Sequence, residues 1–239
     1  MEVRAQNILK LYHRRRGGAN AFAAVEPCDF LLPAGKLTVI GGRSGSGKST
    51  LLNMLAGILT PSQGQVMYDG ADLYAMQDDA LSRFRAMNIG YIPQGRSAVS
   101  SLTVMENVML PLILSGEAGE QKALEEMRRF GILDLKDAMP EKLSGGELRR
   151  MAIARALMRS PKVLFADEPT GDLDDENTEL VFRELRRIAD TGCAVLMVTH
   201  EESASAYADR LFRMNAGRVE EAGEAGTGAA GADDSSAAG

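Results

Sequence analysis

Cysteine and histidine are scarce in this chain of 239 residues, and no apolar run is long. The two cysteines, Cys28 and Cys193, lie far apart in sequence and each stands beside apolar residues. We interpret them as small buried side chains rather than as a disulfide or a metal pair, a usage typical of a reducing cytosol. The longest apolar segments, VMLPLIL and CAVLMV, are far shorter than the roughly 18 residues that a membrane-spanning helix needs. If the protein acts at a membrane, another chain must span it.

Basic residues are also in the minority. The chain has 27 lysines and arginines against 33 aspartates and glutamates, a formal net charge of -6 at pH 7. Because contacts with a phosphate backbone need a basic face, this balance disfavours nucleic acid as the main partner. The arginine run at residues 14–16 is interpreted as a solvated loop. The first ten residues lack the apolar stretch of a secretory signal, so we expect none there.

Three short apolar runs predict the fold. GKLTVIGG, PKVLFADEP and GCAVLMVTH are each interpreted as a buried strand, and helical patterns such as STLLNMLAGIL and ENTELVFRELRRIAD lie next to them. Strands that are apolar throughout and alternate with helices predict an α/β protein with a mainly parallel sheet covered on both faces. Ligands bind at the carboxyl ends of the strands in such sheets. We therefore expect the chemistry just after these three runs.

The chain divides into one folded unit and a tail. A single large unit suits the length of the chain, and we assign it to residues 1–221. Between about residues 95 and 158 the apolar pattern is helical and no strong strand intervenes, which predicts a helical subdomain. Residues 222–239 are nearly all small and have no apolar period, which predicts a disordered tail.

The segment GRSGSGKS, residues 42–49, follows the first apolar run and precedes a helical pattern. It matches the phosphate-loop pattern G-x-x-x-x-G-K-[ST]. The glycines let backbone N–H groups turn inward around the β- and γ-phosphates, Lys48 adds a point charge, and Ser49 offers its hydroxyl to Mg²⁺. This spacing, with a strand before it and a helix after it, predicts a site for a nucleoside triphosphate.

Four further polar residues stand after predicted strands. Asp167 and Glu168 follow VLFA; an aspartate there is the usual Mg²⁺ partner of a phosphate loop, and the adjacent glutamate can polarise a water in line with the γ-phosphate. His200 closes VLMVTH and is a candidate for a γ-phosphate contact, although a lone histidine there is more often structural. The carboxamide of Gln94 can ligate Mg²⁺ or its water, but by itself Gln94 would be unremarkable.

A second helix start also contains glycines. In KLSGGELRRMAIARAL, residues 142–157, Ser144 can cap a helix and Glu147 can reach back to it, so the pattern predicts a capping box that opens an amphipathic helix. Gly145 and Gly146 then lie in the first turn, where a glycine costs about 0.5 to 1 kcal/mol relative to alanine. The capping pattern does not explain them.

Taken in order, the phosphate loop, Gln94, LSGGE, VLFADEP, GDLD and His200 resemble the ATP-binding cassette (ABC) ATPase family, and the resemblance covers nearly everything from Val3 to Glu221. It implies a P-loop NTPase core with a mainly parallel sheet flanked by helices, an N-terminal antiparallel β portion and an inserted α-helical signature subdomain. It also implies ATP as the nucleotide, Mg²⁺ as the ion, and ATP hydrolysis as the activity.

The resemblance assigns a role to each matching position. It makes Ser49, Gln94 and Asp167 the Mg²⁺ ligands, and it makes Lys48, Glu168 and His200 the catalytic residues, with Glu168 as general base and His200 as switch histidine. Tyr12 resembles the aromatic that stacks on adenine, with Phe22 as a competitor. The implied nucleotide-binding residues are Tyr12, Gly42, Arg43, Ser44, Gly45, Ser46, Gly47, Lys48, Ser49, Thr50, Gln94, Ser144, Gly145, Gly146, Glu147 and Asp174.

Members of this family work as head-to-tail dimers with two ATP molecules between the subunits, and the signature motif supplies the second side of each site. The resemblance therefore implies a homodimer on ATP binding and assigns Ser144 to the nucleotide of the partner subunit. The two signature glycines then let a γ-phosphate approach bare backbone N–H groups at the positive end of a helix dipole. GDLD, residues 171–174, corresponds to the loop that crosses the dimer interface, with Asp174 in the aspartate position of the family.

Within the family, ENVMLPL, LSGGELRRMAIARAL and LFADEPTGDLD resemble the branch that serves lipoprotein release, macrolide and antimicrobial-peptide export, and cell division. Its members pair with separate permeases, which implies an integral membrane permease as partner, export as the process, and a place on the cytoplasmic face of the cell membrane. The alternative is a regulator that signals through a permease-like protein to a cell-wall hydrolase. GRSAVSSLTV, in the region that faces the permease, lacks the aromatic and proline residues common there.

Overall fold

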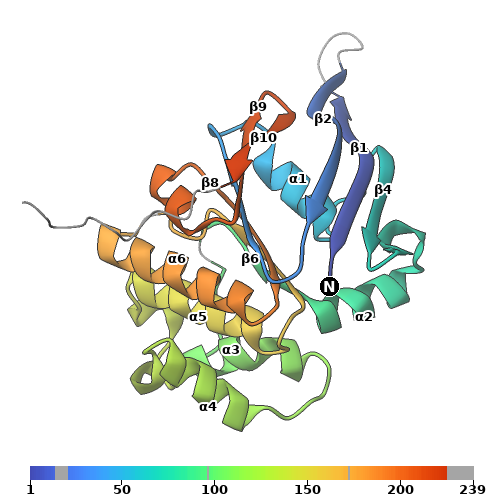
Figure 1. The fold of residues 1–239 in the computed structure, drawn as a ribbon. Helices are drawn as coiled ribbons and strands as arrows, with labels where there is room; N and C mark the ends of the chain where they lie inside the picture. Colours follow the sequence, from blue (N-terminus) through green and yellow to red (C-terminus); the bar gives the residue numbers. More distant parts are fainter. Residues whose placement is uncertain (14–20, 96, 172, 225–239) are drawn as a thin grey trace, which may run out of the picture.

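The computed structural model describes residues 1–13, 21–95, 97–171 and 173–224 (Figure 1). The strands are β1 Val3–His13, β2 Ala21–Leu32, β3 Leu37–Gly41, β4 Gln63–Tyr68, β5 Ala71–Asp72, β6 Ile89–Ile92, β7 Val163–Asp167, β8 Ala194–Thr199, β9 Arg210–Asn215 and β10 Arg218–Glu224. The α-helices are α1 Lys48–Leu55, α2 Asp78–Asn88, α3 Val104–Ile113, α4 Glu120–Arg129, α5 Gly145–Leu157 and α6 Asp175–Asp190. The arginine run at residues 14–16 lies outside the described residues. Of the tail expected at residues 222–239, the structure describes residues 222–224, which belong to β10, and residues 225–239 lie outside the described residues.

A central sheet has its described strands in the order β10-β9-β3-β8-β7-β6. All neighbouring pairs are parallel except β10 with β9. The three apolar runs of the sequence are β3, β8 and β7, which lie side by side. Every residue of β7 and β8 is buried, as expected of parallel strands with both faces covered. The predicted α/β fold with a mainly parallel sheet is confirmed.

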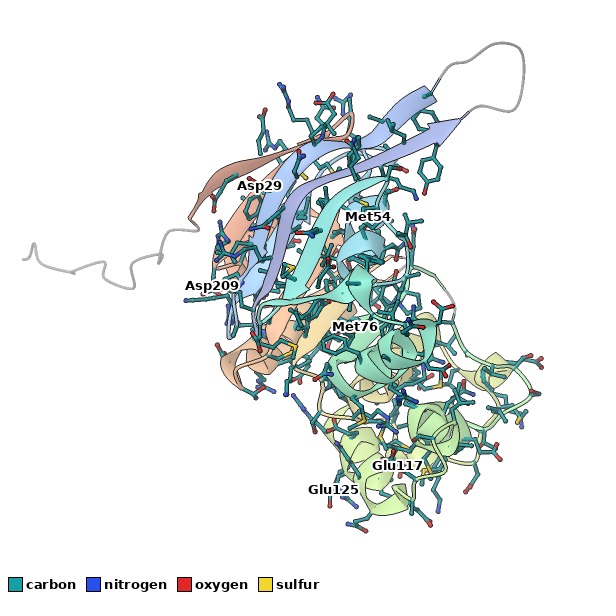
Figure 2. The ribbon with its side chains drawn as sticks, turned by 90° about the vertical axis from the view of Figure 1, so that its right-hand side faces the viewer. Asp29, Met54, Met76, Glu117, Glu125 and Asp209 are labelled. Carbon is teal, nitrogen blue, oxygen red and sulfur yellow. The ribbon has the colours of Figure 1, made fainter. Side chains whose placement is uncertain are left out.

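A second, antiparallel sheet has the order β2-β1-β4-β5 and confirms the N-terminal antiparallel β portion. Helix α1 lies between the two sheets (Figure 1). Its Met54 is completely buried in the interior (Figure 2). The helix that follows the phosphate loop is therefore packed on both sides.

The hydrophobic core lies on both faces of the central sheet. Successive residues of a strand point to opposite faces, so Leu164 and Ala166 of β7 pack in the cluster formed with α3, α4, α5 and α6. Val163 and Phe165 pack in the other cluster, with α1 and the antiparallel sheet. The full burial of β7 on both sides fixes the position of the polar residues at its carboxyl end.

Helices α3, α4 and α5 occupy the part of the chain expected to be helical, and no strand lies among the described residues of 93–162. Helices α3 and α4 lie at the lower end of the molecule and strands β1 and β2 extend toward its upper end (Figure 1). Glu117 and Glu125 are at this lower end (Figure 2). None of the helices in the described ranges has the length and apolar character needed to cross a membrane.

Candidate functional site

The phosphate loop connects the carboxyl end of β3 to the first turn of α1. Gly47 stands before the helix with φ at 109°, and a Cβ there would overlap the carbonyl oxygen of Ala24, so only glycine fits. The Lys48 side chain is buried and folds back over the loop, where its Nζ donates to the carbonyl oxygens of Gly42 at 2.6 Å and Arg43 at 3.1 Å. The loop is thus closed around one buried cation.

Ser49 and Asp167 form the oxygen-rich side of this site. Ser49 Oγ donates a hydrogen bond of 2.9 Å to Asp167 Oδ1 at the end of β7. Burial raises the pKa of the Asp167 carboxyl, and the hydrogen bond from Ser49 partly offsets that effect. A divalent cation beside a buried carboxyl stabilises its charged form and so opposes the effect of burial on its pKa.

The donors near Asp167 suit Mg²⁺. The Ser49 hydroxyl bonds the Asp167 carboxylate, and the carboxamide of Gln94 lines the same cavity as Ser49. Within the described ranges there is no cluster of three or more His, Cys, Asp or Glu side chains that could enclose a metal. Mg²⁺ keeps several waters and binds through one or two carboxylates together with substrate phosphates, so it fits this open oxygen set.

Glu168 joins the ends of three strands. Its Oε1 lies 3.5 Å from Lys48 Nζ after β3, and its Oε2 lies 2.9 Å from Nδ1 of His200 after β8. The His200 backbone N–H also donates to Oε2. Glu168 has φ at 45°, a left-handed conformation that costs of order 1 kcal/mol in a residue other than glycine. Its carboxylate is therefore held in place by a buried lysine on one side and by a histidine, 61% exposed, on the other.

A cavity of about 500 Å³ opens over the phosphate loop. Lys48, Ser49, Gln94 and Glu168 are among the residues that line it, whereas Asp167 is not among them and is connected to the cavity by its hydrogen bond to Ser49. His200 lies beside a neighbouring hollow, with Gly42 and Arg43, and reaches this cavity through Glu168. The full lining is Tyr12, Phe22, Ala23, Ala24, Ser44, Gly45, Gly47, Lys48, Ser49, Thr50, Gln94, Glu168, Ala216 and Gly217.

Both candidate aromatics stand at the rim of this cavity. Tyr12 of β1 is paired with Phe22 of β2 in the strand register, and their ring centroids are 5.9 Å apart. Lys10 Nζ lies 5.6 Å from the Tyr12 ring centroid. The rings are 38% and 45% exposed, which leaves each of them area for a further flat contact.

We expect Tyr12→Ala to weaken ATP binding by about 5- to 150-fold, because stacking of a base on an aromatic ring contributes about 1 to 3 kcal/mol. Phe22→Ala should weaken it less. The measurement is the Kd of ATP by calorimetry, with inorganic triphosphate as the control ligand, since it has no base and should bind both variants like the wild type. An equal loss for triphosphate would mean that the variants disturb the phosphate loop, and a larger loss in Phe22→Ala would assign the stacking to Phe22.

The signature motif forms the expected capping box at the start of α5. Ser144 Oγ accepts from the Glu147 N–H, and Glu147 Oε2 accepts from the Ser144 N–H at 2.7 Å and from its hydroxyl at 2.8 Å. These bonds lower the pKa of the Glu147 carboxyl. None of residues 144–147 lines the cavity that contains Lys48; Gly145 instead lies at a separate hollow of about 220 Å³ with Gly171. The structure does not bring the signature to the phosphate loop of the same chain.

The loop at residues 171–174 leads into α6. Asp174 caps that helix, its carboxylate accepting from the Asn177 N–H at 2.8 Å, and this bond lowers the pKa of Asp174. Asp174, like the signature, is not part of the lining around Lys48. Asp172 of the same motif lies outside the described residues.

Two arginines of α5 hold the segment around Gln94, and sequence reasoning missed them. Arg149 Nη1 donates to the carbonyl oxygen of Pro93 at 2.9 Å. Arg155 donates to the carbonyl oxygen and the hydroxyl of Ser97 at 2.8 and 2.6 Å. The available signal was Arg155, which follows Met151 and Ala152 of the predicted apolar stripe by four and three residues, because a cation on such a face must find a polar partner when it is buried.

Comparison with known proteins agrees with this geometry. A family model described as "ABC transporter" matches residues 25–171. The lipoprotein-releasing system ATP-binding protein LolD of Bdellovibrio bacteriovorus is 38% identical, over 90% of this chain and 99% of that protein. The macrolide export ATP-binding/permease protein MacB of Chlorobaculum tepidum is 37% identical over 89% of this chain, which spans only 33% of that longer protein. A solved dimeric ATP-binding cassette in a post-hydrolysis state bound to ADP and Pi superimposes with a TM-score of 0.83 at 31% identity, over 92% of this chain and 98% of that one.

Proposed function

This chain belongs to the ABC transporter family and is an ATPase of that family, and on that premise we propose that it dimerises head to tail on ATP and drives a separate integral membrane permease for export. The observation that carries the proposal is the separation of the two glycine-bearing motifs. Lys48, Ser49 and Glu168 share one cavity, whereas Ser144 is not among its lining residues. A second copy is the simplest recipient of an exposed signature motif.

The proposed chemistry is transfer of the γ-phosphoryl group of ATP to water. Lys48 and the backbone N–H groups of the phosphate loop hold the β- and γ-phosphates. Ser49, Asp167 and Gln94 would hold Mg²⁺, which neutralises phosphate charge when bound. Glu168 accepts a proton from the attacking water as the new P–O bond forms and the bond to ADP breaks. His200 keeps the Glu168 carboxylate in position through the 2.9 Å contact between Nδ1 and Oε2.

Assembly of two copies would complete each site. Solved relatives of this fold include dimeric cassettes, one of them bound to ADP and Pi. In the proposed dimer, the capped first turn of α5 points its free backbone N–H groups at the nucleotide of the partner subunit. Release of phosphate would then remove the charge that holds the two chains together.

An exposed apolar surface supports a permease as the further partner. Met87 at the end of α2 is 58% exposed, Ile113 at the end of α3 is 48% exposed, and Leu114 is 79% exposed. The three are near one another because Arg159 contacts both Met87 Sδ and the carbonyl oxygen of Pro111, and also bonds the Ser115 hydroxyl. The names of LolD and MacB, which refer to lipoprotein release and macrolide export, support export as the process.

We expect the double variant Ile113→Asp/Leu114→Asp to lose the permease. Two charges buried without partners in an apolar contact should reduce co-purification from native membranes by roughly tenfold or more, since each factor of ten corresponds to only about 1.4 kcal/mol. The ATPase rate of the isolated protein should stay unchanged. The measurement is pulldown of the tagged protein with identification of the recovered membrane protein by mass spectrometry.

Leu180→Asp is the matched control, because Leu180 is 44% exposed but lies on α6. If the Ile113→Asp/Leu114→Asp variant recovers as much permease as Leu180→Asp does, the permease does not dock on the surface at Ile113 and Leu114. Recovery of a permease-like protein together with a cell-wall hydrolase would replace export by regulation of that hydrolase. Recovery of no membrane protein from wild-type membranes would refute the permease proposal.

A further inference from the structure

Asn177 connects the signature helix to the start of α6. It is the third residue of α6, and its side-chain Oδ1 accepts a hydrogen bond of 2.8 Å from Nη1 of Arg150 on α5. Its Nδ2 donates to both carboxylate oxygens of Asp174, at 2.8 and 3.0 Å. The amide thus bridges a cation on one helix and an anion at the start of the next.

An amide suits this position. A guanidinium can only donate and a carboxylate can only accept, so the side chain between them must accept on one side and donate on the other. Asparagine does both at the required length. An aspartate would place a second carboxylate against Asp174, and an alanine would leave the bond between Arg150 and the Asp174 turn broken.

The same amide lies against the signature turn. A Cβ built on Gly146 would come within 2.9 Å of Asn177 Oδ1 and 3.1 Å of its Cγ, closer than real Cβ contacts normally are. Any side chain at residue 146 must therefore displace Asn177. This gives the second signature glycine a reason inside its own chain, in addition to the approach of a phosphate.

We propose that Asn177 is a positioning residue that fixes the signature turn at Gly146 and the Asp174 loop as one rigid unit, so that one subunit presents both segments together to the nucleotide of the other. The inference rests on the proposed head-to-tail dimer. Asn177 touches no nucleotide in this account; it acts through Gly146, Arg150 and Asp174.

The test is a double-mutant cycle in a Glu168→Gln background, which blocks turnover and lets the ATP-bound dimer accumulate. The quantity measured is the dimer Kd by analytical ultracentrifugation with saturating ATP. We expect Gly146→Ala and Asn177→Ala each to weaken the dimer by about tenfold. Adding Gly146→Ala to Asn177→Ala should weaken it by much less than tenfold, because the clash of residue 146 disappears with the amide and only its effect on the phosphate approach remains. ATP binding to the monomer should be unchanged throughout, which a general loss of structure would not allow.

Asp175→Ala is the matched control, an exposed acidic residue in the same helical turn, and should leave the dimer Kd within about twofold. If Asn177→Ala does not fold, as thermal melting will reveal, Arg150→Met should weaken the dimer and Arg150→Lys should weaken it less. An equal loss on Gly146→Ala with and without Asn177 would overturn the inference, as would a normal dimer in Asn177→Ala. A Glu168→Gln parent that forms no dimer on ATP would instead refute the head-to-tail proposal, and the inference with it.

Discussion

Replacing Glu168 with glutamine is expected to lower kcat for ATP hydrolysis by about 10²- to 10⁴-fold, the usual contribution of a general base. The change removes the proton acceptor and keeps the size and shape of the side chain. Oε1 lies 3.5 Å from Lys48 Nζ and Oε2 lies 2.9 Å from His200 Nδ1. The single oxygen of glutamine can accept from Lys48, and its amide N–H can donate to Nδ1 of a neutral His200. The structure around the phosphate loop should therefore persist in the variant.

Binding of ATP should survive, because the groups assigned to the phosphates are the loop backbone and Lys48 rather than Glu168. The measurements are the ATP Kd by calorimetry and the hydrolysis rate by phosphate release. Loss of one buried negative charge beside Lys48 adds to the attraction for an anionic nucleotide, so the Kd is expected to stay equal or to fall. The combination of tight binding and absent turnover is also what makes the ATP-bound dimer accumulate.

The matched control is Glu201→Gln, the same change immediately after His200, at a residue that does not line the cavity over Lys48. It should alter kcat by no more than about twofold. A loss below tenfold in Glu168→Gln would remove Glu168 from the role of base. A comparable loss in both variants would indicate that the charge of this sheet edge, rather than one proton acceptor, sets the rate.

The arrangement of the Lys48 cavity could be predicted because each part of it is local in sequence. Lys48 and Ser49 begin the helix that a short loop joins to β3, and Asp167 and Glu168 stand at the carboxyl end of β7. The two pairs are therefore brought to the same edge as soon as the strands pair in parallel. The apolar runs were enough to predict those strands. The capping box at Ser144 was equally readable, since its partner Glu147 is three residues away.

The contacts between α5 and its neighbours could not be read in the same way. Arg149 and Arg155 bond the segment around Gln94, which precedes them by more than fifty residues in the sequence. Asn177, which lies against Gly146, belongs to α6, and strand β7 separates α6 from α5 in the sequence. Helical periodicity predicts which face of a helix is buried, but it does not predict the element that packs on that face. The cost of Gly146 was visible in the sequence, whereas its cause depends on tertiary packing.

Mixing two inactive variants is expected to restore ATP hydrolysis. Lys48→Ala removes the buried cation of the phosphate loop, and Ser144→Arg places a large cation at the exposed start of α5, where the partner's γ-phosphate is proposed to approach. In each homodimer, both sites carry the substitution. In a mixed dimer, both substitutions fall in one site, and the other site has an unchanged phosphate loop and an unchanged signature motif. With equal amounts and random pairing, half of the dimers are mixed, so the mixture should recover about a quarter of the wild-type rate if the two sites turn over independently.

The control for Ser144→Arg is Thr103→Arg, which introduces the same residue at the N-cap of another capping box. Thr103 caps α3 in a capping box with Glu106, so both variants lose one cap, worth about 0.5 to 2 kcal/mol of stability. Thr103→Arg should keep the ATPase rate of the isolated protein near wild type, because nothing in the proposed dimer brings a phosphate to α3. A Ser144→Arg homodimer as active as the wild type would refute the composite site. Activity in the mixture but in neither homodimer would exclude a site built from one chain alone, because every chain in that mixture carries one of the two substitutions.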